Sequence, residues 1–146
     1  MEHQETIETL NHLLQGAFIG IDSYNRYLNH VEDYDLRHRL EKQELLHRRI
    51  AHELASHIRD LGGEPSDSAG FKGNMANLMN NLHLTGSRST FEILDMVSDG
   101  LKMAIDSLEQ AAMELDGDSR ALVEKHLTQD RVMFREIEEY KRRALH

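Results

Sequence analysis

Four residues on two helical stretches have the types and spacing to bind a metal ion. Glu44 and His47 are three positions apart, and His126 and Asp130 are four positions apart. Both spacings place a pair of side chains on one face of a helix. Two imidazoles and two carboxylates suit Zn, Mn or Fe(II). The pattern therefore predicts a mononuclear metal or small-molecule site in which these four residues are the ligands.

The same region also supports a purely structural interpretation. Gln43, His47, His126 and Gln129 interrupt the apolar seams of their helices at similar depth. Buried polar groups must pair, since leaving one without a partner costs about 1–3 kcal/mol. A paired polar layer would set the register between the helices. We favour this layer and keep the metal site as the alternative.

Four amphipathic helices must position these groups. Apolar residues recur at steps of three and four, which is the pattern of helices packed at a shallow angle in a bundle. Asp35 is a candidate N-cap, as is Ser89 or Thr90, and the run 62–65 (Gly-Gly-Glu-Pro) is a strong helix stop. The pattern predicts helices over residues 5–32, 35–61, 90–115 and 119–143.

The lengths of the connections predict the topology. The first two helices and the last two are joined by only a few residues, so each pair must form an antiparallel hairpin. The crossover 62–89 is long enough to run the length of a bundle, and its apolar spacing predicts a short helix over a groove, formed by Met75, Leu78, Met79, Leu82 and Leu84. Residues 1–146 therefore read as one all-α domain, an antiparallel four-helix bundle with the single long crossover of ferritin-like topology.

An internal repeat supports the two hairpins. Residues 16–23 (GAFIGIDS) match residues 100–107 (GLKMAIDS) at an offset of 84, and a weaker charged match follows at an offset of 83. This favours duplication of one hairpin. The first and third helices would then be equivalent across a pseudo-two-fold axis.

Composition excludes several function classes. The net charge of −9 repels nucleic acids and anionic membranes, and no apolar run reaches the roughly 20 residues that span a bilayer. There is no cysteine, and the acidic N-terminus does not resemble a signal peptide, so we expect a cytoplasmic protein. No Ser/His/Asp arrangement or phosphate-binding glycine loop is visible. We predict no catalytic or cofactor-binding residue.

Three sequence features carry a resemblance to a known family. They are Leu10-Asn11-x-Leu13-Leu14, the run from Glu53-Leu54 to Gly62-Gly63-x-Pro65, and Gly100 followed by Ala104. With these features the chain resembles the ferritin-like superfamily, and most closely its bacterial DUF2383-type branch. The resemblance implies the four-helix fold and suggests a bacterial stress setting.

The chain departs from the iron-binding pattern of that superfamily. Di-iron members need one Glu from each of two helices and Glu-x-x-His from each of the other two. Glu44-Leu-Leu-His47 is the only such element, and Ile21 and Leu101 stand where the resemblance would place a Glu after glycine. Two Fe ions would then lack two bridging carboxylates, so we predict no standard di-iron centre.

Two functions remain open. The first is a structural or interaction protein, not an enzyme, which would form a homodimer through helix faces where Leu13, Phe18 and Ile19 add apolar surface. Its protein partner is not evident from the sequence. The second is a metal-binding or oxidase-like protein that holds Fe, Mn or Zn at the nonstandard site described above.

Overall fold

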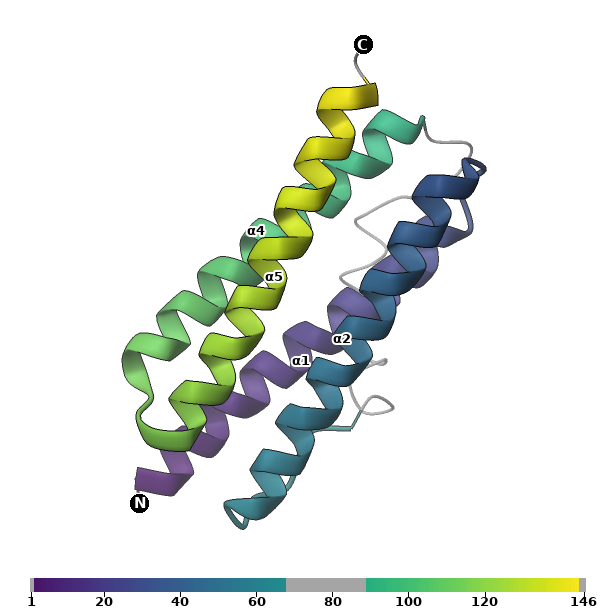
Figure 1. Ribbon diagram of the computed structural model, residues 1–146. Coiled ribbons are helices and arrows are strands. Elements are labelled where there is room, and N and C mark those ends of the chain that lie inside the picture. Colours follow the sequence, from purple (N-terminus) through teal and green to yellow (C-terminus); the bar gives the residue numbers. More distant parts are fainter. Residues whose placement is uncertain (1, 68–88, 145–146) are drawn as a thin grey trace.

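The computed structural model describes residues 2–67 and 89–144 and arranges them as four long helices (Figure 1). Helix α1 covers Glu2–Leu28, α2 covers Tyr34–Asp60, α4 covers Thr90–Glu114 and α5 covers Gly117–Ala144. The four predicted helices are confirmed. The prediction was wrong about the end of the first helix, which stops four residues before the expected position at residue 32.

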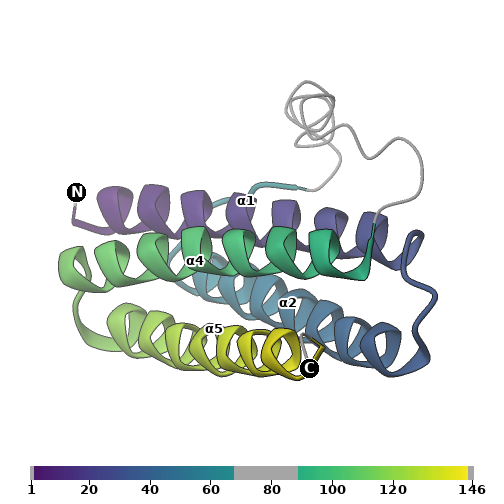
Figure 2. The same ribbon diagram turned by 90° about the horizontal axis from the view of Figure 1, so that it is seen from above.

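The helices pack as two antiparallel hairpins, α1 with α2 and α4 with α5. Between the hairpins, α1 lies beside α4 and α2 lies beside α5 (Figure 2). Helices α2 and α4 run in the same direction in Figure 1. This arrangement confirms the predicted four-helix bundle with one long crossover. The short helix predicted around Met75 and Leu84 lies outside the described residues.

The turn between α1 and α2 explains why α1 ends early. Asn29 N–H donates to the Arg26 carbonyl at 3.1 Å, which tightens the last turn. Arg37 from α2 then donates to the Leu28 carbonyl at 2.6 Å and satisfies an acceptor that the helix leaves open. Asp33 is the N-cap of α2 and accepts from Leu36 N–H at 2.9 Å, so the expectation of Asp35 as the cap was wrong. Asp35 instead pairs with Arg39 one turn later.

Helix α2 ends in a Schellman motif, as its glycine pair suggests. Gly63 N–H donates to the Ile58 carbonyl and Gly62 N–H to the Arg59 carbonyl, both at 2.9 Å. Gly62 has φ +85°, in the left-handed region that costs side chains energy. At the start of α4, the N-cap is Ser89, one of the two predicted candidates.

Replacing Gly62 by alanine should lower the free energy of unfolding by about 1 kcal/mol. A Cβ atom there would meet no atom within 4 Å, so the cost comes from the backbone alone. Gly16→Ala is the matched control, because Gly16 lies inside α1 in equally open space. There alanine should stabilise by up to about 1 kcal/mol. Urea unfolding of both variants measures this, and effects of the same sign would contradict the strain assignment.

The core is mainly aliphatic and continuous along the bundle. Residues from all four helices are almost fully buried, among them Leu10, Leu14, Leu36, Leu40, Leu54, Ile58, Ile93, Leu94 and Ile137. Within the described part of the chain, none of the helices is both long and apolar enough to cross a membrane. Among the residues that the structure describes, seven polar or charged ones share this core, and most of them lie on α2 and α5.

Candidate functional site

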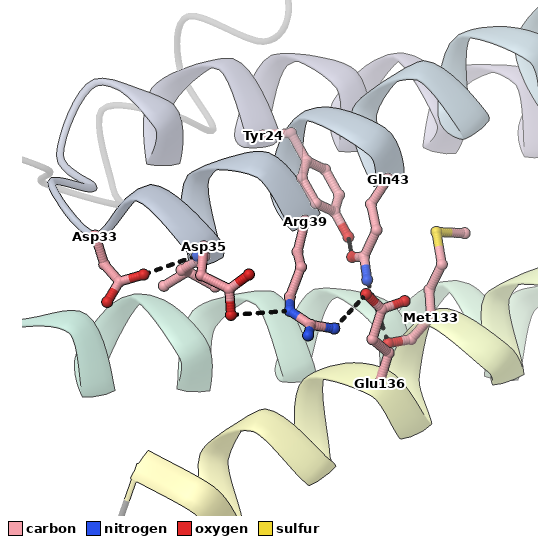
Figure 3. Close-up of polar contacts among 8 residues, drawn as sticks. Tyr24, Asp33, Asp35, Arg39, Gln43, Met133 and Glu136 are labelled. Atoms are coloured by element: carbon pink, nitrogen blue, oxygen red, sulfur yellow. Dashed lines mark hydrogen bonds and ion pairs between the residues drawn. The ribbon is translucent and has the colours of Figure 1, made fainter.

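Polar contacts join α2 and α5 at several points along the bundle. Figure 3 shows those between the first half of α2 and the second half of α5. Arg39 on α2 pairs with Glu136 on α5 at 3.1 Å. One turn further along α2, the Gln43 side chain donates to the Met133 carbonyl at 3.4 Å. Gln43 also accepts a hydrogen bond of 2.6 Å from the Tyr24 hydroxyl of α1. Gln43 therefore connects three helices from a buried position.

His47 lies one turn after Gln43 along α2 and faces α1 near Gly20. Only 5% of its surface is exposed, and its ring centroid is 5.0 Å from that of Tyr24. A Cβ atom on Gly20 would lie 3.8 Å from the imidazole, so glycine is the α1 residue opposite His47. Within the described structure Nε2 of His47 has no hydrogen-bond partner. Burial lowers the pKa of His47 to about 4, so the ring is neutral at physiological pH.

His126 occupies the equivalent seam of α5 and is fully buried. Its Nε2 lies 3.7 Å from a carboxylate oxygen of Glu53, which is too long for a hydrogen bond. Neither ring nitrogen has a hydrogen-bond partner in the described part of the chain. Burial lowers the pKa of His126, and the nearby Glu53 carboxylate opposes this shift in part. Glu53 itself accepts from Lys125 at 2.8 Å.

Asp130 lies one helical turn from His126, and only 3% of its surface is exposed. Its Oδ1 atom has no hydrogen-bond partner among the described residues. Burial raises the pKa of Asp130 to about 7, so this carboxyl is largely protonated in mildly acidic solution. Burial likewise raises the pKa of Tyr24, with a smaller contribution from the Asp130 charge.

Glu44, the fourth predicted ligand, is buried but already paired. Its carboxylate accepts from the guanidinium of Arg48 on the next turn of α2. Over residues 2–67 and 89–144, no three His, Asp or Glu side chains come together in an arrangement that could hold a metal ion. His47, His126 and Asp130 are thus all buried in the core, whereas Glu44 is paired with Arg48. The role of these four residues as joint metal ligands stays a prediction.

The predicted polar layer is present in part. Gln43 is paired, whereas Oε1 of Gln129 has no partner in the described structure. One member was missed from the sequence, Tyr24, as was the close approach of Gly20 to the His47 ring. Tyr24 follows the apolar spacing of α1, yet a buried tyrosine hydroxyl needs a partner, and this requirement could have linked it to Gln43.

The donor set does not fit a dinuclear iron centre of the ferritin type. Such a centre draws carboxylates from all four helices. Among the described residues, α1 and α4 bury no Asp or Glu, and the only buried carboxyl groups are Glu44 and Asp130. Leu101 fills the middle of α4 and is itself buried.

Most of this sequence matches a known protein family. Residues 5–114 match the family described as a domain of unknown function, DUF2383. The chain belongs to the DUF2383 family. No curated protein matches this DUF2383 chain.

Solved structures share the fold of the DUF2383 chain. A ferritin-like, diiron-carboxylate protein from Bacillus anthracis has a TM-score of 0.74 at 18% identity, over 97% of this chain and 98% of its own. A Dps1 mutant from Mycobacterium smegmatis reaches 0.80 at 14% identity, over 96% and 97% of the two chains. A two-domain protein from Anabaena variabilis, with DJ-1/ThiJ/PfpI-like and ferritin-like domains, reaches 0.79 at 10% identity over 98% of this chain. The DUF2383 chain spans only 37% of that last protein. These likenesses establish a ferritin-like four-helix bundle.

Proposed function

We propose that this protein is a ferritin-like bundle in which a buried polar layer replaces the dinuclear iron centre, and that it acts as a structural or interaction subunit. The observation that carries the proposal is the lack of buried carboxylates on the described parts of α1 and α4. Two Fe ions bring four positive charges, which one paired Glu44 and one Asp130 cannot balance.

The electrostatics of the layer support the proposal. Burial keeps His47 uncharged, and it raises the pKa of the neighbouring core residue Asp130 to about 7, so that this carboxyl is only about half ionised at pH 7. The bond from Tyr24 to Gln43 ties α1 to α2, and the bond from Gln43 to the Met133 carbonyl ties α2 to α5. Such a layer sets the register between the two hairpins. A role in bacterial stress rests on analogy with the superfamily.

Self-association is part of the proposed role, and the surface available for it on α1 is smaller than the sequence suggests. Ile19 is 37% exposed, whereas Leu13 belongs to the buried core and Phe18 packs partly against it. A homodimer through this face would therefore centre on Ile19. Sedimentation equilibrium of the wild type and Ile19→Lys tests this, because the lysine should dissociate the dimer. A monomeric wild type would remove this part of the proposal.

Elemental analysis of the untagged protein tests the absence of a di-iron centre. We expect less than about 0.1 equivalent of Fe per chain, both after purification and after aerobic addition of Fe(II), because bridging carboxylates are missing. The fold should persist in chelator, since the core is continuous without metal. Two Fe per chain, or unfolding in chelator, would overturn the proposal.

A second candidate function is a mononuclear metal site. The specific observation that favours it is the set of buried atoms without hydrogen-bond partners on His47, His126 and Asp130. Calorimetric titration with Zn, Mn and Fe(II) should show one equivalent bound if this function holds, and Glu44→Ala/His47→Ala should abolish it. Glu41→Ala/His38→Ala, on the exposed face of the same helix, is the control. Absence of binding by the folded wild type would eliminate this candidate.

A further inference from the structure

A cavity of about 880 Å³ lies between α1 and α4, and Ile50 and Leu54 of α2 form its base. Figure 2 shows α1 and α4 side by side along the same edge of the bundle. The volume falls within the range of about 300–1,000 Å³ that is typical of small-molecule sites. Aliphatic side chains such as Val97, Leu101 and Leu108 make the walls mostly apolar. The cavity is therefore large enough for a compact organic ligand.

Small residues on the two helices leave this space open. Gly16 and Gly20 line it from α1, and Gly100 and Ala104 line it from α4 with the same spacing. A Cβ atom added to Gly16 or Gly100 would meet no other atom within 4 Å. Gly16 and Gly100 are also equivalent positions of the internal repeat. The two halves of the chain therefore contribute matching gaps to one cavity.

Three polar residues on the inner wall of this cavity belong to the core. They are Tyr24, Tyr27 and His47, and each is at most 6% exposed. The Tyr24 hydroxyl donates to Gln43, and the Ser23 side chain is the hydrogen-bonding neighbour of the Tyr27 hydroxyl. Nε2 of His47 is buried. A ligand therefore meets these residues mainly through their rings, and its binding needs no hydrogen bond to them.

The charge at the rim of the cavity is negative. Glu64 and Asp67, which follow α2, are exposed and line the cavity, whereas no Lys or Arg does so among the described residues. Asn11 of α1 fixes this segment, since its side chain donates to the Glu64 carbonyl at 3.0 Å and accepts from Ser66 N–H at 2.8 Å. A cationic ligand would be attracted to this rim, and an anionic one would be repelled.

A second, smaller cavity extends the acidic rim. It measures about 310 Å³ and shares His12, Leu13 and Ser107 with the first one. Glu8 and Glu114 line it and are exposed, and again no described lining residue is Lys or Arg. The open edge between α1 and α4 is thus acidic at more than one place, in keeping with the net charge of −9.

We infer that the larger cavity binds a cationic amphiphile, that is, a small molecule with an apolar body and an ammonium group. The body fills the space between Gly16 and Gly100, where its contacts with the aliphatic walls replace contacts with water. The ammonium group stays at the exposed rim beside Glu64 and Asp67, so it keeps part of its hydration. The inference goes beyond the proposed function, because a bundle without iron and a bundle with one metal ion both retain this cavity.

Binding of three naphthalenes to the full chain tests the inference, with their fluorescence as the readout. At neutral pH 2-naphthylmethylamine is cationic, 2-methylnaphthalene is neutral and naphthalene-2-carboxylate is anionic. At low ionic strength we expect saturable 1:1 binding of the amine, at least about threefold weaker binding of the neutral compound, and at least about tenfold weaker binding of the carboxylate. No saturable binding, or any other order of the three affinities, would overturn the inference.

Filling the cavity from α1 tests where the ligand binds. Gly16→Leu should weaken the amine and 2-methylnaphthalene at least about tenfold, because its side chain enters the space of the apolar body. Asn25→Leu is the matched control, since it adds leucine to an exposed position of the same helix that does not line the cavity. Equal effects of the two leucines would overturn the inference. Circular dichroism checks folding, and Gly100→Leu fills the same space from α4 should Gly16→Leu not fold.

The acidic rim has its own test. Glu64→Gln/Asp67→Asn should weaken the amine at least about threefold and leave 2-methylnaphthalene within about twofold. Asp60→Asn/Glu139→Gln removes the same two charges from exposed positions of α2 and α5 that do not line the cavity, and it should leave both ligands within about twofold. Equal weakening of the amine by the two double variants would show that only net charge matters and would overturn the position assigned to the ammonium group.

Discussion

Asp130→Asn should raise the free energy of unfolding at pH 8 by up to about 4 kcal/mol and change it little at pH 4. The pKa of Asp130 rises from 3.8 to about 7 on folding. A tenfold change in a proton-binding constant corresponds to about 1.4 kcal/mol. The folded protein therefore holds a proton on this carboxyl between these two pH values that the unfolded chain has released. Stability is lost as pH rises through this window, and asparagine, which never ionises, avoids the loss.

His47 makes the pH profile of this variant more informative. Its pKa falls from 6.5 to about 4 on folding, so its contribution is present above pH 6.5 and is lost as pH falls toward 4. In the wild type the opposite slopes of Asp130 and His47 largely cancel between pH 4 and 6.5. In Asp130→Asn the slope from His47 is no longer opposed, and His126, whose pKa burial also lowers, adds to it, so stability should rise by at least about 3 kcal/mol over that range.

Urea unfolding at pH 4.5, 6 and 8 measures both effects. Asp106→Asn is the control, because Asp106 is exposed on α4. It should change stability by less than about 0.5 kcal/mol at each pH. If Asp130→Asn gave the same change at pH 4.5 and pH 8, the carboxyl would not be held in its protonated form by burial.

Tyr24→Phe and Gln43→Leu should each lower the free energy of unfolding by about 2 kcal/mol, while the double variant should lose much less than the sum. Each single change leaves a buried polar atom of the 2.6 Å bond without its partner. Replacing both partners removes the unpaired group, so the coupling energy should be about 1–3 kcal/mol. A double-mutant cycle by urea unfolding gives this value.

Tyr34→Phe is the matched control for the hydroxyl deletion. Tyr34 is 84% exposed, so its hydroxyl stays hydrated in either state and the change should stay within about 0.5 kcal/mol. Strict additivity of the two core substitutions would mean that Gln43 and Tyr24 do not depend on each other. The polar layer would then contribute nothing to the register of the hairpins.

Local sequence patterns were enough to predict the four helices. They did not predict the N-cap of α2 or the end of α1, because these depend on contacts between helices. Asp33 and Asp35 are both suitable N-caps by residue type, but Asp33 takes the role because it also accepts from Tyr140 of α5 at 3.1 Å. The early end of α1 has a similar cause, since Arg37 of α2 caps the Leu28 carbonyl. In both cases the deciding contact comes from another helix: Tyr140 is 107 residues away from Asp33, and Arg37 belongs to α2 and not to α1.

For the candidate site, too, the sequence predicts which residues are buried but not which groups they contact. Helical periodicity was sufficient to place Gln43, His47 and His126 inside the bundle, and all three are buried. Periodicity does not determine which group each one meets. Glu44 was counted as a ligand because it precedes His47 by three positions, yet it pairs with Arg48 on its own helix. Tyr24 carried no polar signal in the apolar seam, although its hydroxyl completes the bond to Gln43.

The sequence by itself determined the four helices, the two hairpins, the crossover, and the aliphatic residues Ile21 and Leu101 that argue against a di-iron centre. These follow from spacing along one chain, where each helix repeats its faces every 3.6 residues. The tertiary structure decided which buried polar atoms find partners and where the bundle stays open. The cavity between Gly16 and Gly100 exists because two helices distant in sequence present their smallest residues toward the same space. That coincidence depends on how the helices rotate and separate as their other side chains pack.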